Sequence, residues 1–191
     1  KIWNLFVADR LTGRAIKVLS EYDQDGWVDN HGQIYFLKDG KIILLSEKSG
    51  YMHIWMSKHS GSNIWPITVG KWEVSSITKI DEDSKLIYFI ANKESVHEKK
   101  LYSIRFDGTD LKLLTPEKGN HSIFLTGTRE RFIDSYSSTD IPKRILLKNL
   151  YNREEVRVLG ETDIGQFIDY DWSYPQIIKF RSLDNTVDLH G

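Results

Sequence analysis

Four stretches of this sequence align with one another without gaps, and this repeat constrains the possible fold more than any other feature. Each stretch has an apolar segment, a turn, and a second segment that finishes on an apolar residue or Thr. The stretches are residues 5–19, 54–68, 101–115 and 145–159. Their last residues lie 49, 47 and 44 positions apart. A period of this length indicates a repeat architecture in which each copy is one supersecondary unit packed against its neighbours.

The turn of each stretch favours a β-hairpin, because Gly and Asn adopt the positive φ angles that tight turns between strands require. The predicted turns are Thr12-Gly13, Ser60-Gly61, Asp107-Gly108 and Tyr151-Asn152. Two more strands are expected ahead of each of the last three hairpins. They are predicted at residues 33–37 and 41–47, 75–80 and 86–92, and 122–126 and 132–137, with turns at Asp39-Gly40, Glu82-Asp83 and Arg129-Glu130.

The repeating unit is therefore four antiparallel strands in 44 to 49 residues, which is the size and content of one blade of a β-propeller. The predicted fold class is all-β, a partial β-propeller over residues 1–163. It holds about three and a half blades, because the first hairpin lacks two preceding strands. Such a half-blade leaves a strand edge without its partner, so the parent protein is expected to contain further blades upstream.

The last part of the chain has a different character. Residues 164–175 show no strand alternation and end on Pro175, so they are predicted to be a linker. Residues 176–191 are predicted to form one strand, a turn at Asp184-Asn185 and the start of another strand. The chain is expected to be an excised segment, because Lys1 begins it in the middle of a strand without a signal peptide or an initiating Met.

Charge and composition exclude several functional classes. The 26 Lys and Arg residues stand against 27 Asp and Glu, and the longest basic run is Lys99-Lys100, so no nucleic-acid partner is expected. No apolar run reaches the length of a membrane span. The absence of Cys rules out disulfides, thiol catalysis and thiolate metal sites, but it does not identify a cellular compartment.

No compact catalytic or metal-binding pattern is present in the sequence. The Gly-x-Ser-x-Gly motif of a hydrolase nucleophile is absent, and the His residues do not have the spacing of a metal site. Those His residues stand at positions 31, 53, 59, 97, 121 and 190. The run Asp81-Glu82-Asp83 indicates a solvated turn rather than a calcium loop. We therefore predict no catalytic, cofactor-binding or metal-binding residue in this chain.

Three further groups allow a functional or a structural interpretation. Glu47 and His53 bracket a predicted turn, and they could form a proton-transfer pair or, as their strand context favours, a cross-strand contact that sets the register. The rings at positions 27, 72 and 172, all Trp, could stack on a ligand, but packing between blades is the favoured role. Asn120-His121-Ser122 has the form of an N-glycosylation acceptor, which has no meaning in a bacterial protein.

A resemblance to a known family rests on residues of the second and third repeats. LLSEKSGYMHIW at residues 44–55 is followed by ITVGKWEV at residues 67–74 and IYFIANKES at residues 87–95. This order resembles the later propeller blades of the dipeptidyl peptidase IV family. SYPQIIKFRSLDNTVDLHG at residues 173–191 resembles the opening of that family's α/β-hydrolase domain, apart from Asn185, where the family usually has Gly.

The resemblance implies a parent in which an eight-bladed propeller caps an α/β-hydrolase that removes N-terminal Xaa-Pro or Xaa-Ala dipeptides. It also implies a periplasmic or secreted location, peptide substrates, contact with the parent's own hydrolase domain, a possible homodimer and no cofactor. In the family, the catalytic Ser, Asp and His would lie beyond Gly191. The acidic pair that holds the substrate amine, and its Arg, would lie before Lys1. No catalytic residue is carried onto this chain.

Three functions are therefore weighed for the chain. The favoured one is the propeller part of a dipeptidyl aminopeptidase IV-like serine peptidase, in which the propeller gates and positions the peptide substrate. The alternatives are a non-catalytic propeller that binds peptides or proteins, and a structural scaffold used for dimer contact. Whether the parent keeps an active catalytic triad is left open by the sequence.

Overall fold

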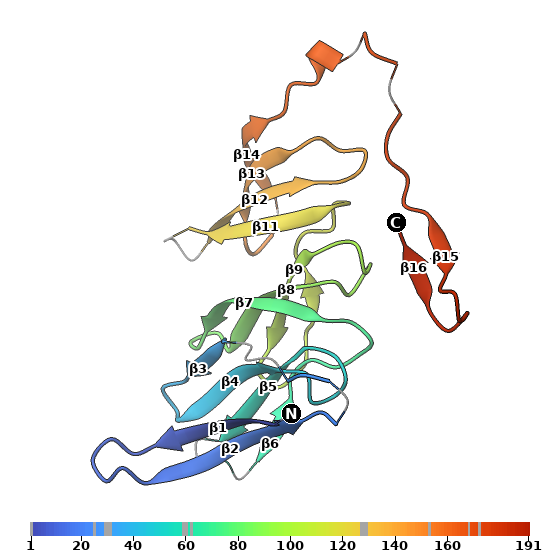
Figure 1. The fold of residues 1–191 in the computed structure, drawn as a ribbon. Coiled ribbons are helices and arrows are strands. Elements are labelled where there is room, and N and C mark those ends of the chain that lie inside the picture. The colour runs from blue at the N-terminus through green and yellow to red at the C-terminus, as the bar shows by residue number, and fades with distance from the viewer. Residues whose placement is uncertain are drawn as a thin grey trace. The chain divides into compact units, whose positions relative to one another are not determined.

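The structure is a computed structural model, and it describes residues 2–24, 26–28, 32–58, 61, 63–126, 130–152, 154–167, 169–171 and 173–191. The chain divides into two compact units, Lys1–Pro116 and Glu117–Gly191. Strands make up nearly all of the regular structure in both units (Figure 1). Within the described ranges, no helix is long and apolar enough to cross a membrane.

The first unit contains one two-stranded and two four-stranded antiparallel sheets. The small sheet pairs β1 (Ile2–Ala8) with β2 (Ala15–Tyr22). The next sheet has β3 (Ile34–Phe36), β4 (Lys41–Ser46), β5 (His53–Lys58) and β6 (Ile64–Pro66). The third has β7 (Val74–Asp81), β8 (Leu86–Ala91), β9 (Lys100–Arg105) and β10 (Lys112–Leu113). In both larger sheets, neighbouring strands are also neighbours in the sequence.

The second unit contains one four-stranded sheet and a separate hairpin. The sheet runs in chain order through β11 (Asn120–Leu125), β12 (Arg131–Ser137), β13 (Arg144–Asn149) and β14 (Glu155–Glu161). A single 3-10 turn, η1 (Gly165–Phe167), follows. The hairpin pairs β15 (Lys179–Arg181) with β16 (Asp188–His190). The predicted three four-stranded sheets and leading hairpin are thus confirmed.

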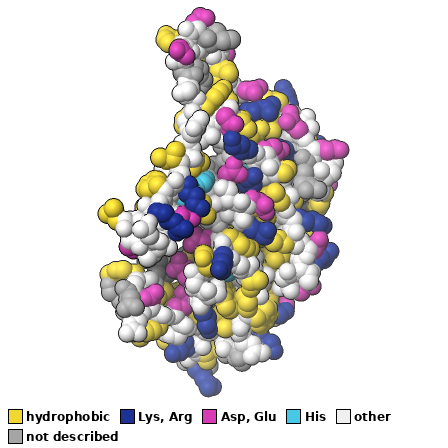
Figure 2. Space-filling model, turned by 90° about the vertical axis from the view of Figure 1, so that its right-hand side faces the viewer, with side chains coloured by type: hydrophobic (Ala, Val, Ile, Leu, Met, Phe, Trp, Pro, Cys, Tyr) yellow, Lys and Arg dark blue, Asp and Glu magenta, His cyan; other side chains and the backbone are white. Residues whose placement is uncertain are grey.

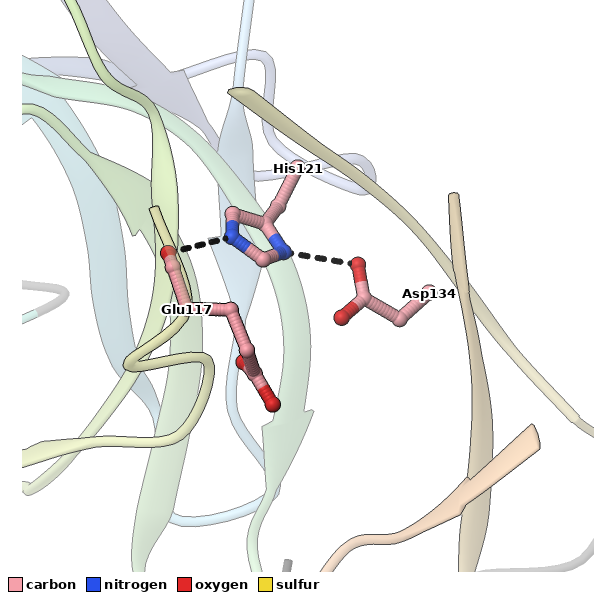
Figure 3. A group of neighbouring side chains, drawn as sticks. All are labelled: Glu117, His121 and Asp134. Atoms are coloured by element: carbon pink, nitrogen blue, oxygen red, sulfur yellow. Dashed lines mark hydrogen bonds and ion pairs between the residues drawn. The ribbon is translucent and has the colours of Figure 1, made fainter. Parts of the chain in front are cut away.

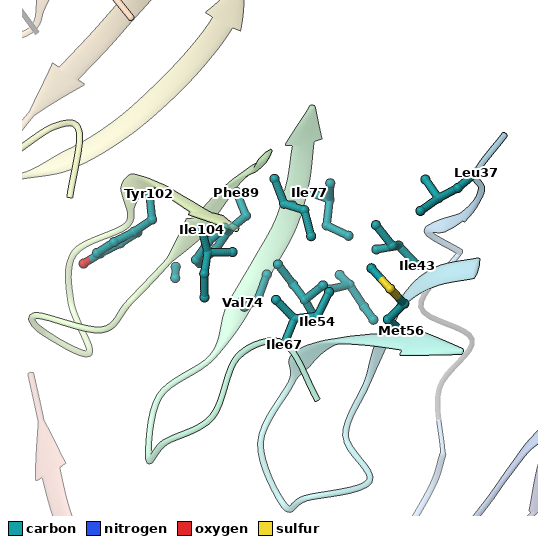
Figure 4. Close-up of a cluster of buried hydrophobic side chains, with 13 residues drawn as sticks. Leu37, Ile43, Ile54, Met56, Ile67, Val74, Ile77, Phe89, Tyr102 and Ile104 are labelled. Carbon is teal, nitrogen blue, oxygen red and sulfur yellow. The ribbon is translucent and has the colours of Figure 1, made fainter. Parts of the chain in front are cut away.

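The core of the first unit arises because strand β4 is covered on both faces. Alternate side chains of a strand point to opposite faces of its sheet. Ile42 and Leu44 pack in one cluster with Val18 and Leu19 of β2. Ile43 lies in a second, larger cluster that draws on β5, β7, β8 and β9 (Figure 4). Such a strand needs a continuous apolar run, which is the sequence IILL that follows Lys41.

Hydrogen bonds also join the second and third sheets. The Gln33 side-chain oxygen accepts a hydrogen bond from the Ile77 backbone N–H at 2.7 Å. The Glu82 carboxylate accepts one from the backbone N–H of Lys38 at 2.8 Å. The predicted acidic turn at residues 81–83 therefore contacts the neighbouring sheet, and Asp81 is buried where it accepts a hydrogen bond from Ser84 N–H.

Two buried threonines explain why two of the repeats end on Thr. Thr68 Oγ1 accepts a hydrogen bond from the backbone N–H of Ile54 at 2.9 Å, and Thr115 Oγ1 accepts the equivalent bond from Leu101 at 2.9 Å. In each pair, the donor is the first residue of an aligned repeat and the acceptor is its last residue, 14 positions later in the chain. The hydroxyl continues the pairing beyond the end of each outer strand, which keeps buried backbone donors satisfied.

The outer strands of these hairpins are shorter than predicted. Strand β6 ends at Pro66, whose nitrogen carries no proton for the ladder. Strand β10 holds only two residues, and it cannot begin before Leu111 because Asp110 has a φ of 56°, which a strand does not allow. The predicted turns at Gly40 and Gly108 are confirmed by φ angles of 80° and 81°. Ser60 and Arg129, which belong to two other predicted turns, lie outside the described residues.

Candidate functional site

Three groups with metal-ligating chemistry converge in the second unit. One ligand atom each of Glu117, His121 and Asp134 lies within 4.8 Å of the other two (Figure 3). His121 is on β11 and Asp134 on β12, where the register pairs them with Tyr136 and Ile123. The two side chains therefore share one face of the sheet as diagonal neighbours. Glu117 precedes β11 in the chain.

Two polar contacts hold the His121 ring in place. Its Nδ1 lies 2.8 Å from Asp134 Oδ1, and its Nε2 lies 3.0 Å from the backbone oxygen of Glu117. Both ring nitrogens therefore lie against oxygen atoms, which holds the imidazole ring from two sides. The ring also stacks on Tyr136, with centroids 4.9 Å apart.

A second cation completes this group. The Lys148 ammonium lies 3.0 Å from Asp134 Oδ2 and 2.6 Å from Glu117 Oε1, and the side chain is 2% exposed. Asp134 and His121 are buried as well. The buried Lys148 ammonium therefore lies between the buried carboxylate of Asp134 and that of Glu117, whose side chain is 36% exposed. A buried ammonium is stable only while it keeps such partners.

The same geometry weighs against a metal ion at this place. The carboxylates of Glu117 and Asp134 already face the Lys148 ammonium, and His121 Nδ1 already binds Asp134. A divalent cation would lie beside the like charge of the Lys148 ammonium unless Lys148 moved away. We therefore describe Glu117, His121, Asp134 and Lys148 as an ion-pair network that ties β11, β12 and β13 together, with Glu117 on its half-exposed side.

His53 shows how a buried histidine makes its hydrogen bonds in the first unit. Its Nε2 lies 3.0 Å from the Gly70 carbonyl oxygen, and its Nδ1 lies 3.0 Å from Thr68 Oγ1. Because Thr68 Oγ1 accepts from Ile54 N–H, its own proton is free to donate to Nδ1. A hydroxyl beside an imidazole is also the start of a nucleophilic pair, but His53 and Thr68 are 1% and 2% exposed. A substrate cannot reach them.

His53 does not make the predicted cross-strand contact with Glu47. The ladder pairs His53 with Ser46, and both of its ring nitrogens contact Thr68 and Gly70. Glu47 is exposed in the turn after β4. The turn that Gly50 N–H closes onto the Glu47 carbonyl moves the register by one residue from the predicted pairing.

The tryptophans have different environments, although one packing role was predicted for all of them. Trp72 packs against the larger core cluster, edge-on to His53 with centroids 4.9 Å apart and stacked on Phe89 at 6.3 Å. Its packing role is confirmed. Trp27 is 72% exposed, so the packing role predicted for it is wrong. Trp172 lies outside the described residues.

Sequence reasoning did not find the ion-pair network. The sequence patterns indicate Asn120-His121-Ser122 as a connection between blades and as a glycosylation acceptor, and Lys148 as part of a strand. The available signal was Lys148 itself, a cation between the apolar residues of ILLKNL at a position where a strand buries its side chain. Exposed Lys is the rule, and a buried one requires a carboxylate partner.

Comparisons with known proteins agree with this architecture. The family profile described as "Dipeptidyl peptidase IV (DPP IV) N-terminal region" matches residues 1–143. A dipeptidyl peptidase 4 of Arthroderma otae is 28% identical over 177 residues, which cover 86% of this chain and 22% of that protein. A probable dipeptidyl peptidase 4 of Aspergillus fumigatus is 31% identical over 135 residues, 66% of this chain and 18% of that protein.

Solved structures show the same fold. The crystal structure of Porphyromonas gingivalis dipeptidyl peptidase 4 matches with a TM-score of 0.84 at 19% identity, over 98% of this chain and 27% of that one. The crystal structure of a putative dipeptidyl aminopeptidase IV from Bacteroides ovatus matches with a TM-score of 0.79 at 22% identity. The match covers 99% of this chain and 30% of that one. The four-stranded sheets are thus blades of a partial β-propeller. The chain spans about a fifth of the length of the curated relatives it matches. On the match over residues 1–143, it belongs to the dipeptidyl peptidase IV N-terminal region family.

Proposed function

We propose that this chain is the last part of the propeller of a serine peptidase that removes N-terminal Xaa-Pro or Xaa-Ala dipeptides. The observation that carries the proposal is the family match over residues 1–143. Relatives with the name dipeptidyl peptidase 4 support it. In this proposal the blades gate the entry of peptides and position them for a hydrolase domain, and the parent protein is periplasmic or secreted.

The division of the chain follows the same proposal. Residues 1–163 form propeller blades, residues 164–175 form the linker, and residues 176–191 open the α/β-hydrolase domain. Strand β14 ends at Glu161, just before the proposed linker. The β15–β16 hairpin has three-residue strands and leaves Phe180 and Leu189 exposed. Isolated hairpins are marginally stable, so a covering hydrolase domain is the expected partner.

Nucleic acid is not a proposed partner. On the face drawn in Figure 2, basic and acidic side chains are intermingled, and Lys and Arg do not gather into one patch. The formal net charge of the chain is -1. A phosphate-binding surface requires clustered positive charge.

The test uses the complete protein that carries this chain. Gly-Pro and Ala-Pro linked to a chromogenic leaving group are compared as free and as N-acetylated substrates. We expect release from the free substrates and much less from the acetylated ones, and we expect no turnover by residues 1–191 alone, because no nucleophile elbow is present in them. Equal release from both substrates would indicate a prolyl endopeptidase. Peptide binding without any release would support the non-catalytic binding module instead.

A further inference from the structure

An open pocket in the first unit lies where the end of β2 meets the turn between β4 and β5. Its volume is about 430 Å³. The side chains that define its chemistry are Glu21, Tyr22, Asp23, Trp27, Glu47 and Lys48. None of these residues belongs to the ion-pair network of the second unit, and the proposed peptidase activity does not use them.

Glu21 is the unusual member of this pocket. It lies on β2 opposite Trp3 and is 5% exposed. Its Oε1 atom is buried and has no hydrogen-bond partner. A carboxylate oxygen that is removed from water without a partner is unfavourable, so it is retained where a ligand supplies the missing donor.

The charges and rings of the pocket indicate the kind of ligand. Among the lining residues that the structure describes, the carboxylates of Glu21, Asp23 and Glu47 stand against the ammonium of Lys48, so this part of the pocket attracts cations. The rings of Trp27 and Tyr22 are 72% and 66% exposed. Aromatic faces of this kind bind ammonium and guanidinium groups, and they also contact the apolar stem of a Lys or Arg side chain.

A metal ion fits the pocket less well than an organic cation does. Metal ligands converge on one point at about 2–2.5 Å from the ion. In the part of the chain that the structure describes, only Glu117, His121 and Asp134 bring three such atoms within 4.8 Å of one another. The carboxylates of the pocket do not form such a group, so an ammonium or a guanidinium on an alkyl stem suits the pocket better.

We propose that this pocket binds an organic cation of the arginine or lysine side-chain type. Glu21 accepts hydrogen bonds from the charged head, and the Trp27 ring covers the alkyl stem. Such a ligand can be a free alkyl amine or a basic side chain of a peptide. The proposal rests on the pocket alone and does not depend on dipeptide release.

The binding test uses calorimetry on the full chain with three probes. Agmatine represents a free alkyl guanidinium, acetyl-arginine amide represents a peptide side chain, and acetyl-citrulline amide is its uncharged counterpart. We expect agmatine to bind and acetyl-citrulline amide not to bind, with weaker binding at high salt because exposed charges are screened. Binding of acetyl-arginine amide as well would identify a peptide side chain as the source. Equal binding of the arginine and citrulline amides, or no binding of either cation, would overturn the proposal.

Two variants test the pocket in opposite directions. Glu21→Gln removes the anionic acceptor and should lower the affinity for agmatine by roughly tenfold or more. Lys48→Gln removes the opposing charge and should raise that affinity. Glu155→Gln, an exposed change on β14 in the other unit, is the matched control and should leave it unchanged.

The thermal transition of each variant separates lost binding from lost folding. Without ligand, Glu21→Gln should melt at the same temperature as the wild type or higher, because it replaces a buried carboxylate with a neutral amide. A Glu21→Gln protein that is folded and binds agmatine as well as the wild type would overturn the assignment of Glu21. A Lys48→Gln protein that binds agmatine more weakly than the wild type would overturn the argument that the negative charge of the pocket attracts the cation.

Discussion

Gly70 and Trp72 are so close that no other residue fits at position 70: a β-carbon there would lie 2.2 Å from Trp72 Nε1. The Trp72 ring cannot move aside easily, because it is held between His53 and Phe89. The φ of Gly70 is 140°, a value that side chains rarely allow. The Gly-x-Trp pattern after the second repeat is therefore a packing requirement of this blade junction.

Gly70→Ala should destabilise the chain more than the matched change at Gly50. Gly50 has a φ of 91°, and a β-carbon there would meet nothing within 4 Å, so Gly50→Ala should cost about 1–2 kcal/mol from backbone strain alone. Gly70→Ala adds the clash with Trp72 and should cost roughly 2 kcal/mol more. Denaturant unfolding of both variants measures the difference. Equal losses would mean that the Trp72 ring gives way.

Trp72→Ala should lower the free energy of unfolding by about 3 kcal/mol, because it leaves a cavity between His53 and Phe89. Trp27→Ala is the control, since that ring is 72% exposed, and it should change stability by no more than about 0.5 kcal/mol. Thermal or denaturant unfolding provides the measurement. An unchanged melting temperature for Trp72→Ala would contradict the packing role of this ring.

Asp134→Asn should be strongly destabilising, because it removes the anion that both His121 and Lys148 face. Breaking one partner of a buried charge group costs about 3–5 kcal/mol. Asp140→Asn provides the comparison: Asp140 pairs with Lys118 at the surface, where water solvates both charges, so little change is expected. Chemical denaturation of the two variants tests this difference. Similar effects would show that the buried network does not stabilise the second unit.

The Tyr102 hydroxyl should ionise late in an alkaline titration. Burial raises the pKa of Tyr102 from 10.0 to about 12, and the nearby charge of Glu94 acts in the same direction. A folded-state pKa above the unfolded value favours the folded chain below pH 10, and this contribution is lost as the pH rises from about 10 to about 12. Absorbance of tyrosinate should show one late component that Tyr102→Phe removes. If the late component persists in Tyr102→Phe, it belongs to another residue.

Much of the fold could be predicted because its signals are local. The strand at residues 41–47 and the observed β4 (Lys41–Ser46) differ by one residue, since an apolar run and a Gly turn define both ends. The 44 to 49 residue period predicted four strands per sheet, because hairpin partners are neighbours in sequence. Prediction was weaker where a turn sets the register. The sequence indicated a contact between His53 and Glu47, whereas the ladder pairs His53 with Ser46.

The sequence by itself determined the all-β class, the four-stranded repeat and the membership that the family match confirms. Only the tertiary structure decided which polar and aromatic groups meet. His121, Asp134 and Lys148 come from three strands, and no spacing rule brings them to one buried point. The same holds for Glu21, which is buried although it is charged, and for Trp27, which stays exposed although it is apolar. Strand formation depends on neighbours in sequence, whereas burial and charge pairing depend on which faces come together in space.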